Sequence, residues 1–283
     1  VMPTKKTMKL DAKGKSLIGI TMGDPGGIGP EVILKALTSP EIRAAANYVV
    51  IGSEKVLSNI SDRVLSDNIS VLDLDNFTVN NALSHKPLPD SGKASVEYIL
   101  KGLDLAINGK IDALVTAPIS KEAIKLAGYN YAGHTELLKE KTSVENVVMF
   151  MVGKGLRVSF VTTHLAVNEI SGAINQENVF STIQITATGL KTFFGIDQPK
   201  IAVCGLNPHC GDGDRFGTEE RDVIIPAIER AQKMGINCHG PLSADTVFNK
   251  ALNGEFDIVV VQFHDQGAIP IKMHAFDSGV NIT

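Results

Sequence analysis

The fold is decided by the stretch Val203–Glu220, which reads V-C-G-L-N-P-H-C-G-D-G-D-R-F-G-T-E-E. The apolar run 201–206 predicts a buried strand, and Glu219 and Glu220 belong to the first turn of a predicted amphipathic helix. A polar, glycine-rich loop that contains His209 separates the two elements. Open α/β sheets place their functional sites in loops of this kind, at the carboxyl ends of strands.

Two further segments have the same form, because each is a β-branched apolar run that ends in a histidine. They are V-S-F-V-T-T-H at 158–164 and I-V-V-V-Q-F-H-D at 258–265, the second being the last strand that we predict. Strands alternate with helices along the chain, which is typical of an α/β fold with parallel sheets. Neighbouring strands of such a sheet can bring their carboxyl ends together, so the three histidines can meet.

His164, His209 and His264 therefore form a candidate metal site. Neutral imidazole is a good ligand for Zn²⁺, Co²⁺ or Ni²⁺, and three protein ligands leave positions open for substrate. A lone histidine after a strand is more often a hydrogen-bonded structural residue, so the hypothesis depends on the repetition. Nearby aspartates could orient the rings, although capping is the alternative and the more usual role for Asp245 in S-A-D-T. These aspartates are Asp212, Asp214, Asp245 and Asp265.

A candidate anion site lies in G-H-T-E, where His134 and Thr135 begin a predicted helix whose free backbone N–H groups point outward. The alternative is that the two residues simply cap the helix. Lys272 could contact a phosphate or donate a proton, and a solvated surface lysine is the alternative. The glycine-rich turn at 23–30 lacks both G-x-G-x-x-G spacing and a P-loop lysine, so we interpret it as a close-packed turn.

Composition narrows the classes of function. The net charge of −4 favours neither nucleic acid nor an acidic membrane as a partner. The three cysteines lack C-x-x-C spacing, which indicates a reducing compartment and no cysteine-ligated zinc. No apolar run approaches the ~18 residues of a membrane span, and the basic N-terminal segment has no apolar signal-peptide core. We therefore predict a cytoplasmic protein without a membrane partner.

Taken together, the motifs resemble those of the 4-hydroxythreonine-4-phosphate dehydrogenase (PdxA) family. In the family's order they are G-D-P-G-G-I-G-P-E, T-A-P-I-S-K, G-H-T-E, T-T-H, L-N-P-H, G-T-E-E, G-P-L-S-A-D-T, H-D-Q-G and G-V-N-I-T. The resemblance implies an isocitrate/isopropylmalate dehydrogenase-like fold, with two α/β/α lobes and a cleft between them. We place the first lobe at 1–127 and the second, with the metal and substrate site, at 128–283. We also expect the natural chain to continue beyond Thr283, into the family's next motif and the return of the first lobe.

The resemblance further implies oxidation of a secondary alcohol with NAD or NADP and a divalent metal, with zinc favoured over cobalt or magnesium. In the parent activity, 4-phosphooxy-L-threonine is oxidised and decarboxylated to 3-amino-2-oxopropyl phosphate during pyridoxal phosphate biosynthesis. A family branch acts instead on 4-phospho-D-threonate or 4-phospho-D-erythronate, and the motifs do not separate the two. A metal-dependent hydrolase and a phosphometabolite-binding protein are the alternatives from other classes.

The family motifs also imply roles for single residues. The metal ligands are His164, His209 and His264, and the substrate contacts are His134, Thr135, Lys272 and Asn281. Lys272 and Asp245 are the candidate catalytic residues, and no cofactor-binding residue is identified. A homodimer with the active site between its subunits is expected. Cys210 and the segment 214–216 depart from the parent enzymes, which keeps the second family branch open.

Overall fold

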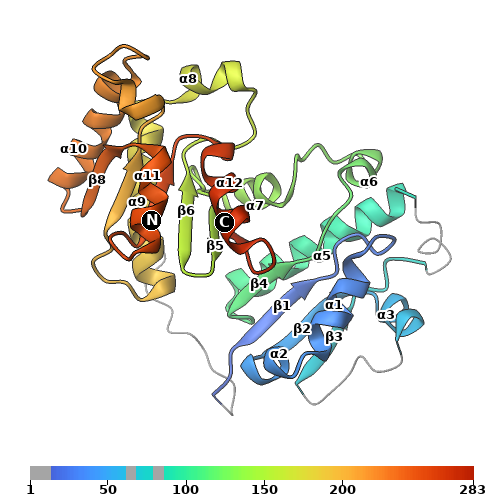
Figure 1. Ribbon diagram of the computed structural model, residues 1–283. Coiled ribbons are helices and arrows are strands. Elements are labelled where there is room, and N and C mark those ends of the chain that lie inside the picture. Colours follow the sequence, from blue (N-terminus) through green and yellow to red (C-terminus); the bar gives the residue numbers. More distant parts are fainter. Residues whose placement is uncertain (1–13, 62–67, 79–85) are drawn as a thin grey trace. The chain divides into compact units, whose positions relative to one another are not determined.

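The computed structural model describes residues 14–61, 68–78 and 86–283 (Figure 1). Most of the basic N-terminal segment therefore lies outside the described residues. The chain forms two compact units, Val1–Ser143 and Val144–Thr283.

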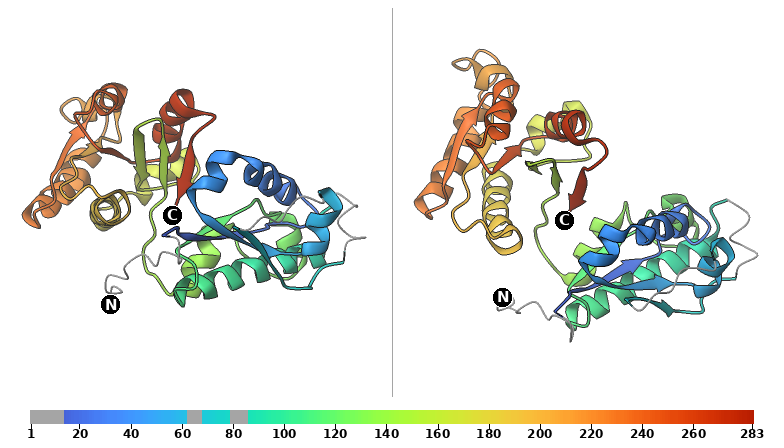
Figure 2. Two further views of the ribbon diagram at one scale, coloured as in Figure 1. Left: turned by 90° about the horizontal axis from the view of Figure 1, so that it is seen from below. Right: turned by 60° about the horizontal axis from the view of Figure 1, so that its bottom comes forward.

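The first unit is built on a four-stranded sheet in the order β3-β2-β1-β4, in which all neighbours are parallel. Helices α1 and α2 cover one face of this sheet and α5 covers the other (Figure 2). The elements are β1 Leu17–Thr21, α1 Gly29–Thr38, α2 Pro40–Ala45, β2 Asn47–Gly52, α3 Glu54–Ile60, β3 Ile69–Asp73, α5 Pro89–Ile107, β4 Ala113–Thr116, α6 Lys121–Leu126 and α7 His134–Thr142.

Helix α7 belongs to the first unit because its buried face packs there. Leu137 joins Val96 and Ile99 of α5 and Ile124 of α6 in one apolar cluster. The two units consequently divide after Ser143, whereas the sequence-based boundary lies at 127.

The second unit contains a six-stranded sheet in the order β10-β5-β6-β9-β7-β8. Strand β9 pairs in parallel with β6 and β7, and β7 pairs in parallel with β8, whereas β5 pairs antiparallel with both β6 and β10. The elements are β5 Phe150–Gly153, β6 Leu156–Phe160, η1 Val167–Glu169, α8 Ile170–Ala173, α9 Gln176–Phe194, β7 Ile201–Cys204, η2 Pro208–Gly211, η3 Glu220–Ile224, α10 Ile225–Lys233, β8 Cys238–Leu242, α11 Ala244–Leu252, β9 Ile258–Val261, α12 His264–Ala275 and β10 Val280–Ile282.

Side-chain alternation along the central strands of this sheet produces a core on each face. Ile258 and Val260 of β9 pack in the cluster under α9 and α10, while Val259 and Val261 pack in the cluster under α11 and α12. All four residues are fully buried, as expected for a parallel strand covered on both faces. The predicted α/β class is therefore present in both units.

The apolar runs before His164, His209 and His264 form strands β6, β7 and β9, as predicted, whereas one local prediction is wrong. A hairpin through Lys154 and Gly155 joins β5 to β6, and the long helix α9 follows further along the chain. The expectation that the strand at 258–265 is the last one is wrong, because β10 follows it and pairs with β5. A three-residue strand that pairs with a partner so distant in sequence leaves no local pattern to detect.

The turn after β1 confirms the close-packed interpretation of the glycine-rich segment. Gly23 has a φ of +73°, and a Cβ there would lie 2.2 Å from the backbone oxygen of Pro118. The next residue, Asp24, donates its backbone N–H to that same oxygen at 3.0 Å. Only glycine allows the chain to pass so close to the end of β4.

Candidate functional site

The three histidines follow three neighbouring strands of the second unit. His164 comes after β6, His209 after β7, and His264 is the first residue of α12 after β9. Strands β6 and β7 both pair in parallel with β9, so the loops that carry the histidines leave the same edge of the sheet. This is the arrangement that open α/β sheets use for ligand sites.

Along this edge of the sheet, His164 and His264 lie close together. The rings of His164 and His264 have centroids 5.8 Å apart, and the ring centroid of Phe160 lies 6.2 Å from that of His264. The Nδ1 atom of His264 is 2.7 Å from a carboxylate oxygen of Asp265. This bond orients the ring and leaves Nε2 available to a ligand.

His209 has a different neighbour. Its Nε2 atom lies 3.8 Å from a carboxylate oxygen of Asp245, near the start of α11. Across the described ranges 14–61, 68–78 and 86–283, no three His, Cys, Asp or Glu side chains are gathered closely enough to hold a metal ion. The chain thus presents a His164–His264 pair and a separate His209–Asp245 pair.

The donor chemistry nevertheless suits a divalent cation. Imidazole nitrogen is a ligand for Zn²⁺ and Co²⁺, and a carboxylate on the other ring nitrogen, as Asp265 provides for His264, commonly orients such a ligand. The thiols are poorer donors, because burial raises the pKa of Cys210 and raises that of Cys238 to about 11. The metal would therefore be held by the histidines.

Two glutamines, which the sequence analysis did not single out, tie these strand ends together. Gln262 is fully buried and donates its side-chain N–H to the backbone oxygen of Cys204 at 2.7 Å. Gln266 accepts the backbone N–H of Gln262 at 2.7 Å and donates to the oxygen of Gly205 at 2.8 Å. Thr162 Oγ1 donates to the oxygen of Gln262 at 2.7 Å. The loops after β6, β7 and β9 therefore share one hydrogen-bond network.

The loop after β7 has an unusual backbone. All six residues from His209 to Asp214 have positive φ angles, and only two of them are glycine. L-residues in the left-handed region cost roughly 1–2 kcal/mol each relative to the right-handed region. A run of this kind persists only where its surroundings impose it, and such strain concentrates at functional sites.

Side chains from the following helix hold this loop. Glu220 is only 4% exposed and accepts the backbone N–H groups of Leu206 and Asn207, each at 2.7 Å. The Asn207 side-chain amide donates to Glu220 at 2.9 Å and to Glu219 at 2.8 Å. The sequence showed these glutamates only as first-turn residues of a helix, because burial of a charged side chain has no local signature.

In the first unit, His134 and Thr135 begin α7, as predicted. The Nε2 atom of His134 is buried and has no hydrogen-bond partner, an arrangement that leaves it ready for a ligand. Burial lowers the pKa of this histidine, and a hydrogen bond with the Ala117 backbone opposes that shift. The imidazole is therefore neutral near pH 7.

The remaining predicted residues lie near the C-terminal end of the second unit. Lys272 is exposed on α12, and Asn281 is exposed on β10, where it is opposite Met151 of β5. Lys272 and Asp265 line an open cavity of about 330 Å³ along one face of α12. Both predicted functions of Lys272, phosphate binding and proton donation, need such exposure.

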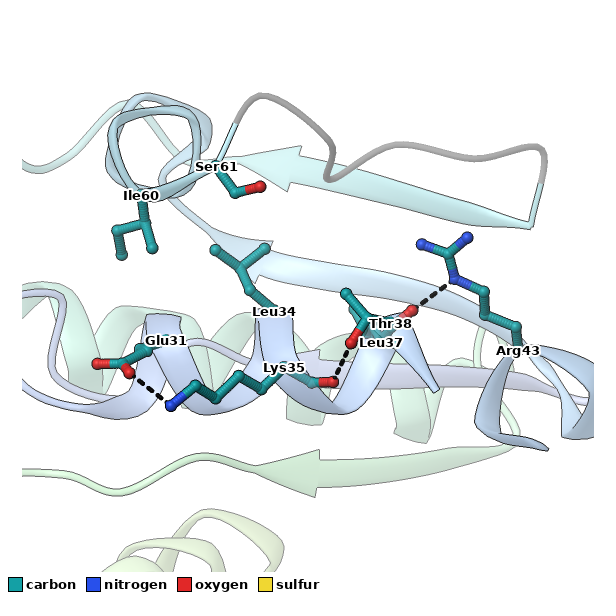
Figure 3. A pocket seen from close by; sticks show the side chains of 8 residues that line it. All are labelled: Glu31, Leu34, Lys35, Leu37, Thr38, Arg43, Ile60 and Ser61. Carbon is teal, nitrogen blue, oxygen red and sulfur yellow. Dashed lines mark hydrogen bonds and ion pairs between the residues drawn. The ribbon is translucent and has the colours of Figure 1, made fainter. Parts of the chain in front are cut away.

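A cavity in the first unit, of about 320 Å³, contains none of the predicted site residues (Figure 3). Leu34 and Ile60 contribute apolar walls, and its cationic groups are already engaged. Lys35 pairs with Glu31 at 2.8 Å, and Arg43 Nε donates to the backbone oxygen of Leu37 at 2.6 Å. We assign it no role.

In the part of the chain that the structure describes, no helix is both long and apolar enough to cross a bilayer.

Comparison with known proteins places the chain in a family. The model for the family described as pyridoxal phosphate biosynthetic protein PdxA matches residues 33–283. The chain is 43% identical over 286 residues to a 4-hydroxythreonine-4-phosphate dehydrogenase of Desulforapulum autotrophicum, covering 95% of this chain and 84% of that protein. It is also 43% identical over 288 residues to an Oceanobacillus iheyensis protein provisionally named D-threonate 4-phosphate dehydrogenase, covering 95% and 86%.

The fold agrees with this match. The crystal structure of a 4-hydroxythreonine-4-phosphate dehydrogenase from Burkholderia phymatum superposes with a TM-score of 0.85 at 36% identity, over 95% of this chain and 87% of that one. A corresponding enzyme from Klebsiella pneumoniae gives a TM-score of 0.86 at 33% identity, over 95% and 86%. The fold class and the family predicted from the motifs are therefore confirmed. The chain belongs to the PdxA family of pyridoxal phosphate biosynthetic proteins.

Proposed function

We propose that this protein is a nicotinamide-dependent dehydrogenase that oxidises and decarboxylates 4-phosphooxy-L-threonine to 3-amino-2-oxopropyl phosphate. The observation that supports this most directly is the 43% identity to a 4-hydroxythreonine-4-phosphate dehydrogenase across 95% of the chain. The histidines at the strand ends and the unpaired Nε2 of His134 supply the polar groups that such a substrate needs. Oxidation of D-threonate 4-phosphate is a second candidate, because an equally similar relative carries that provisional name.

In this proposal His164, His209 and His264 hold a divalent cation, zinc in preference to cobalt or magnesium. When bound, the cation would supply Lewis acidity and NAD, or alternatively NADP, would supply the oxidant. Asp245, 3.8 Å from His209, accepts the proton of the substrate hydroxyl. Lys272 contacts the phosphate and, after CO₂ leaves, protonates the resulting enolate.

The neutral state of His134 defines its part. A neutral imidazole whose other ring nitrogen donates to the backbone has only the Nε2 lone pair left, so His134 accepts a hydrogen bond from a substrate O–H or N–H group. The donors for the phosphate are instead Thr135 and the free N–H groups at the start of α7. Asn281 supplies a further amide to the substrate. A homodimer whose active sites lie between the subunits, and a cytoplasmic location, belong to the same proposal.

The activity can be tested by following absorbance of the reduced nicotinamide. With zinc, cobalt or magnesium supplied, we expect NAD reduction with 4-phosphooxy-L-threonine and slower reduction with 4-phospho-D-threonate or 4-phospho-D-erythronate. A kcat/KM that favours a sugar-acid phosphate by about tenfold, or 1.4 kcal/mol, would assign the chain to the other branch. Phosphate release without reduced cofactor would instead indicate a hydrolase, and binding without turnover a metabolite-binding protein.

A second prediction concerns the phosphate contact of Lys272. Lys272→Ala should weaken binding of the phosphorylated substrate by about 10–100-fold, the range for a lost charge-assisted hydrogen bond of about 1.5–3 kcal/mol. NAD affinity should change far less. Both can be measured by calorimetry, with Lys250→Ala on α11 as the control for loss of a surface charge. Equal losses for substrate and cofactor would contradict a specific phosphate contact.

A further inference from the structure

The carboxylate of Glu220 lies beneath the loop that carries His209, and both of its oxygens are occupied. Oε1 accepts the backbone N–H groups of Leu206 and Asn207, and Oε2 accepts the side-chain amide of Asn207. These bonds fix the backbone of Leu206 and Asn207, the two residues that precede Pro208 and His209. Glu220 is thus attached to the base of the left-handed turn, at its entry.

The surroundings of Glu220 are shaped to admit this carboxylate. A Cβ at Gly205 would lie 3.0 Å from Oε1, and a Cβ at Gly211 would lie 3.1 Å from Oε2. Gly211 also has a φ of +82°, which is costly for other residues. The two glycines flank His209 in sequence, so the turn wraps around the buried carboxylate.

Glu219 determines how the Asn207 side chain is oriented. The Asn207 Nδ2 group donates to a carboxylate oxygen of each glutamate, at 2.8 and 2.9 Å. Glu219 is itself held by the hydroxyl of Ser171, and these two side-chain bonds lower its pKa. An amide that donates to two carboxylates cannot flip without placing its oxygen against a negative charge.

We propose that Glu220 is a positioning residue for His209: it fixes the entry to the left-handed turn and thereby the place of the imidazole. The carboxylate does not act on substrate itself, because Glu220 is 4% exposed and both of its carboxylate oxygens accept hydrogen bonds from the protein. The inference rests on the proposed function only in treating His209 as a metal ligand. Supports of this kind behind metal ligands typically contribute 10–100-fold to metal affinity.

The test measures zinc affinity by competition with a chromophoric chelator, in two backgrounds. Glu220→Gln should weaken zinc binding by about 10–100-fold in the otherwise natural protein. In a His209→Ala background the same change should have an effect of less than about twofold, because the ligand that Glu220 positions is gone. Glu177→Gln, which removes an exposed carboxylate paired with Arg230 in the same unit, is the matched control and should leave affinity unchanged.

The outcomes distinguish the positioning role of Glu220 from the assignment of His209 as a metal ligand. An equal loss in both backgrounds, or no loss in either, would overturn the positioning role of Glu220 while leaving His209 as a ligand. Unchanged affinity in His209→Ala alone would overturn the metal assignment, and the role of Glu220 with it. If Glu220→Gln does not fold, Asn207→Ala provides the second test. It keeps the backbone bonds to Oε1 and removes only the bridging amide, so a smaller loss, again confined to the natural background, is expected.

Discussion

Replacing His264 with alanine should weaken zinc binding by about 10²–10³-fold, while the protein remains folded. Structural zinc sites with four ligands bind with roughly 10–16 kcal/mol, so one ligand accounts for about 2.5–4 kcal/mol. The fold should tolerate the change because the His264 side chain is 34% exposed. Its ring lies near those of His164 and Phe160, with centroids at 5.8 and 6.2 Å, and its Nδ1 atom contacts the carboxylate of Asp265.

Calorimetric zinc titration, with circular dichroism to confirm folding, would measure this effect. His239→Ala is the matched control, since His239 is exposed on β8, where its Nε2 lies 2.8 Å from the side-chain oxygen of Asn237 and its ring centroid lies 6.0 Å from that of Phe256. Zinc affinity should be unchanged in that variant. Retention of full zinc affinity in His264→Ala would remove His264 from the ligand set and leave the ring as a packing partner of Phe160.

The sequence was informative where short-range patterns determine structure. Each candidate metal ligand, His164, His209 or His264, follows an apolar run that contains β-branched residues, and such runs identify central parallel strands because both of their faces are buried. In the structure β6, β9 and β7 are neighbours that pair in parallel, which places the histidine loops along one edge, although the sequence did not determine this order. The start of α7 at His134 was likewise predictable, because helix starts have local signals.

Other features could not be predicted because they depend on distant contacts. Glu220 looks like an ordinary first-turn acid in the sequence, yet it is buried against the backbone of residues 206 and 207. The left-handed run from His209 to Asp214 contains only two glycines, so composition alone does not specify it. The antiparallel pairing of β10 with β5 joins residues far apart in the chain. Histidines at strand ends can be predicted from the sequence, whereas the side chains that hold them in place cannot.

Mixing two inactive single variants should restore activity if the metal site draws on two chains. Within one chain, His164 lies beside His264, while His209 lies beside Asp245. Among the residues that the structure describes, no group of three metal donors is preformed. A second copy of the chain could complete a site in which all three histidines hold one cation, by contributing the ligand that the first copy does not place there. This is why we propose that the active site lies between two subunits.

His209→Ala and His264→Ala should each lose the three-ligand site as homodimers. After subunit exchange, each mixed dimer would retain one complete site, with His209 from one chain and His264 from the other. Random exchange should therefore restore about one quarter of the natural zinc content and activity, because half of the dimers are mixed and each has one of two sites. Native mass spectrometry can verify exchange. Pairing His209→Ala with the double variant His209→Ala/His264→Ala is the control, since no complete site can form. Mixed dimers without recovery would place His209 and His264 of each site on the same chain. His209 would then have to approach the His164–His264 pair within one subunit when the cation binds.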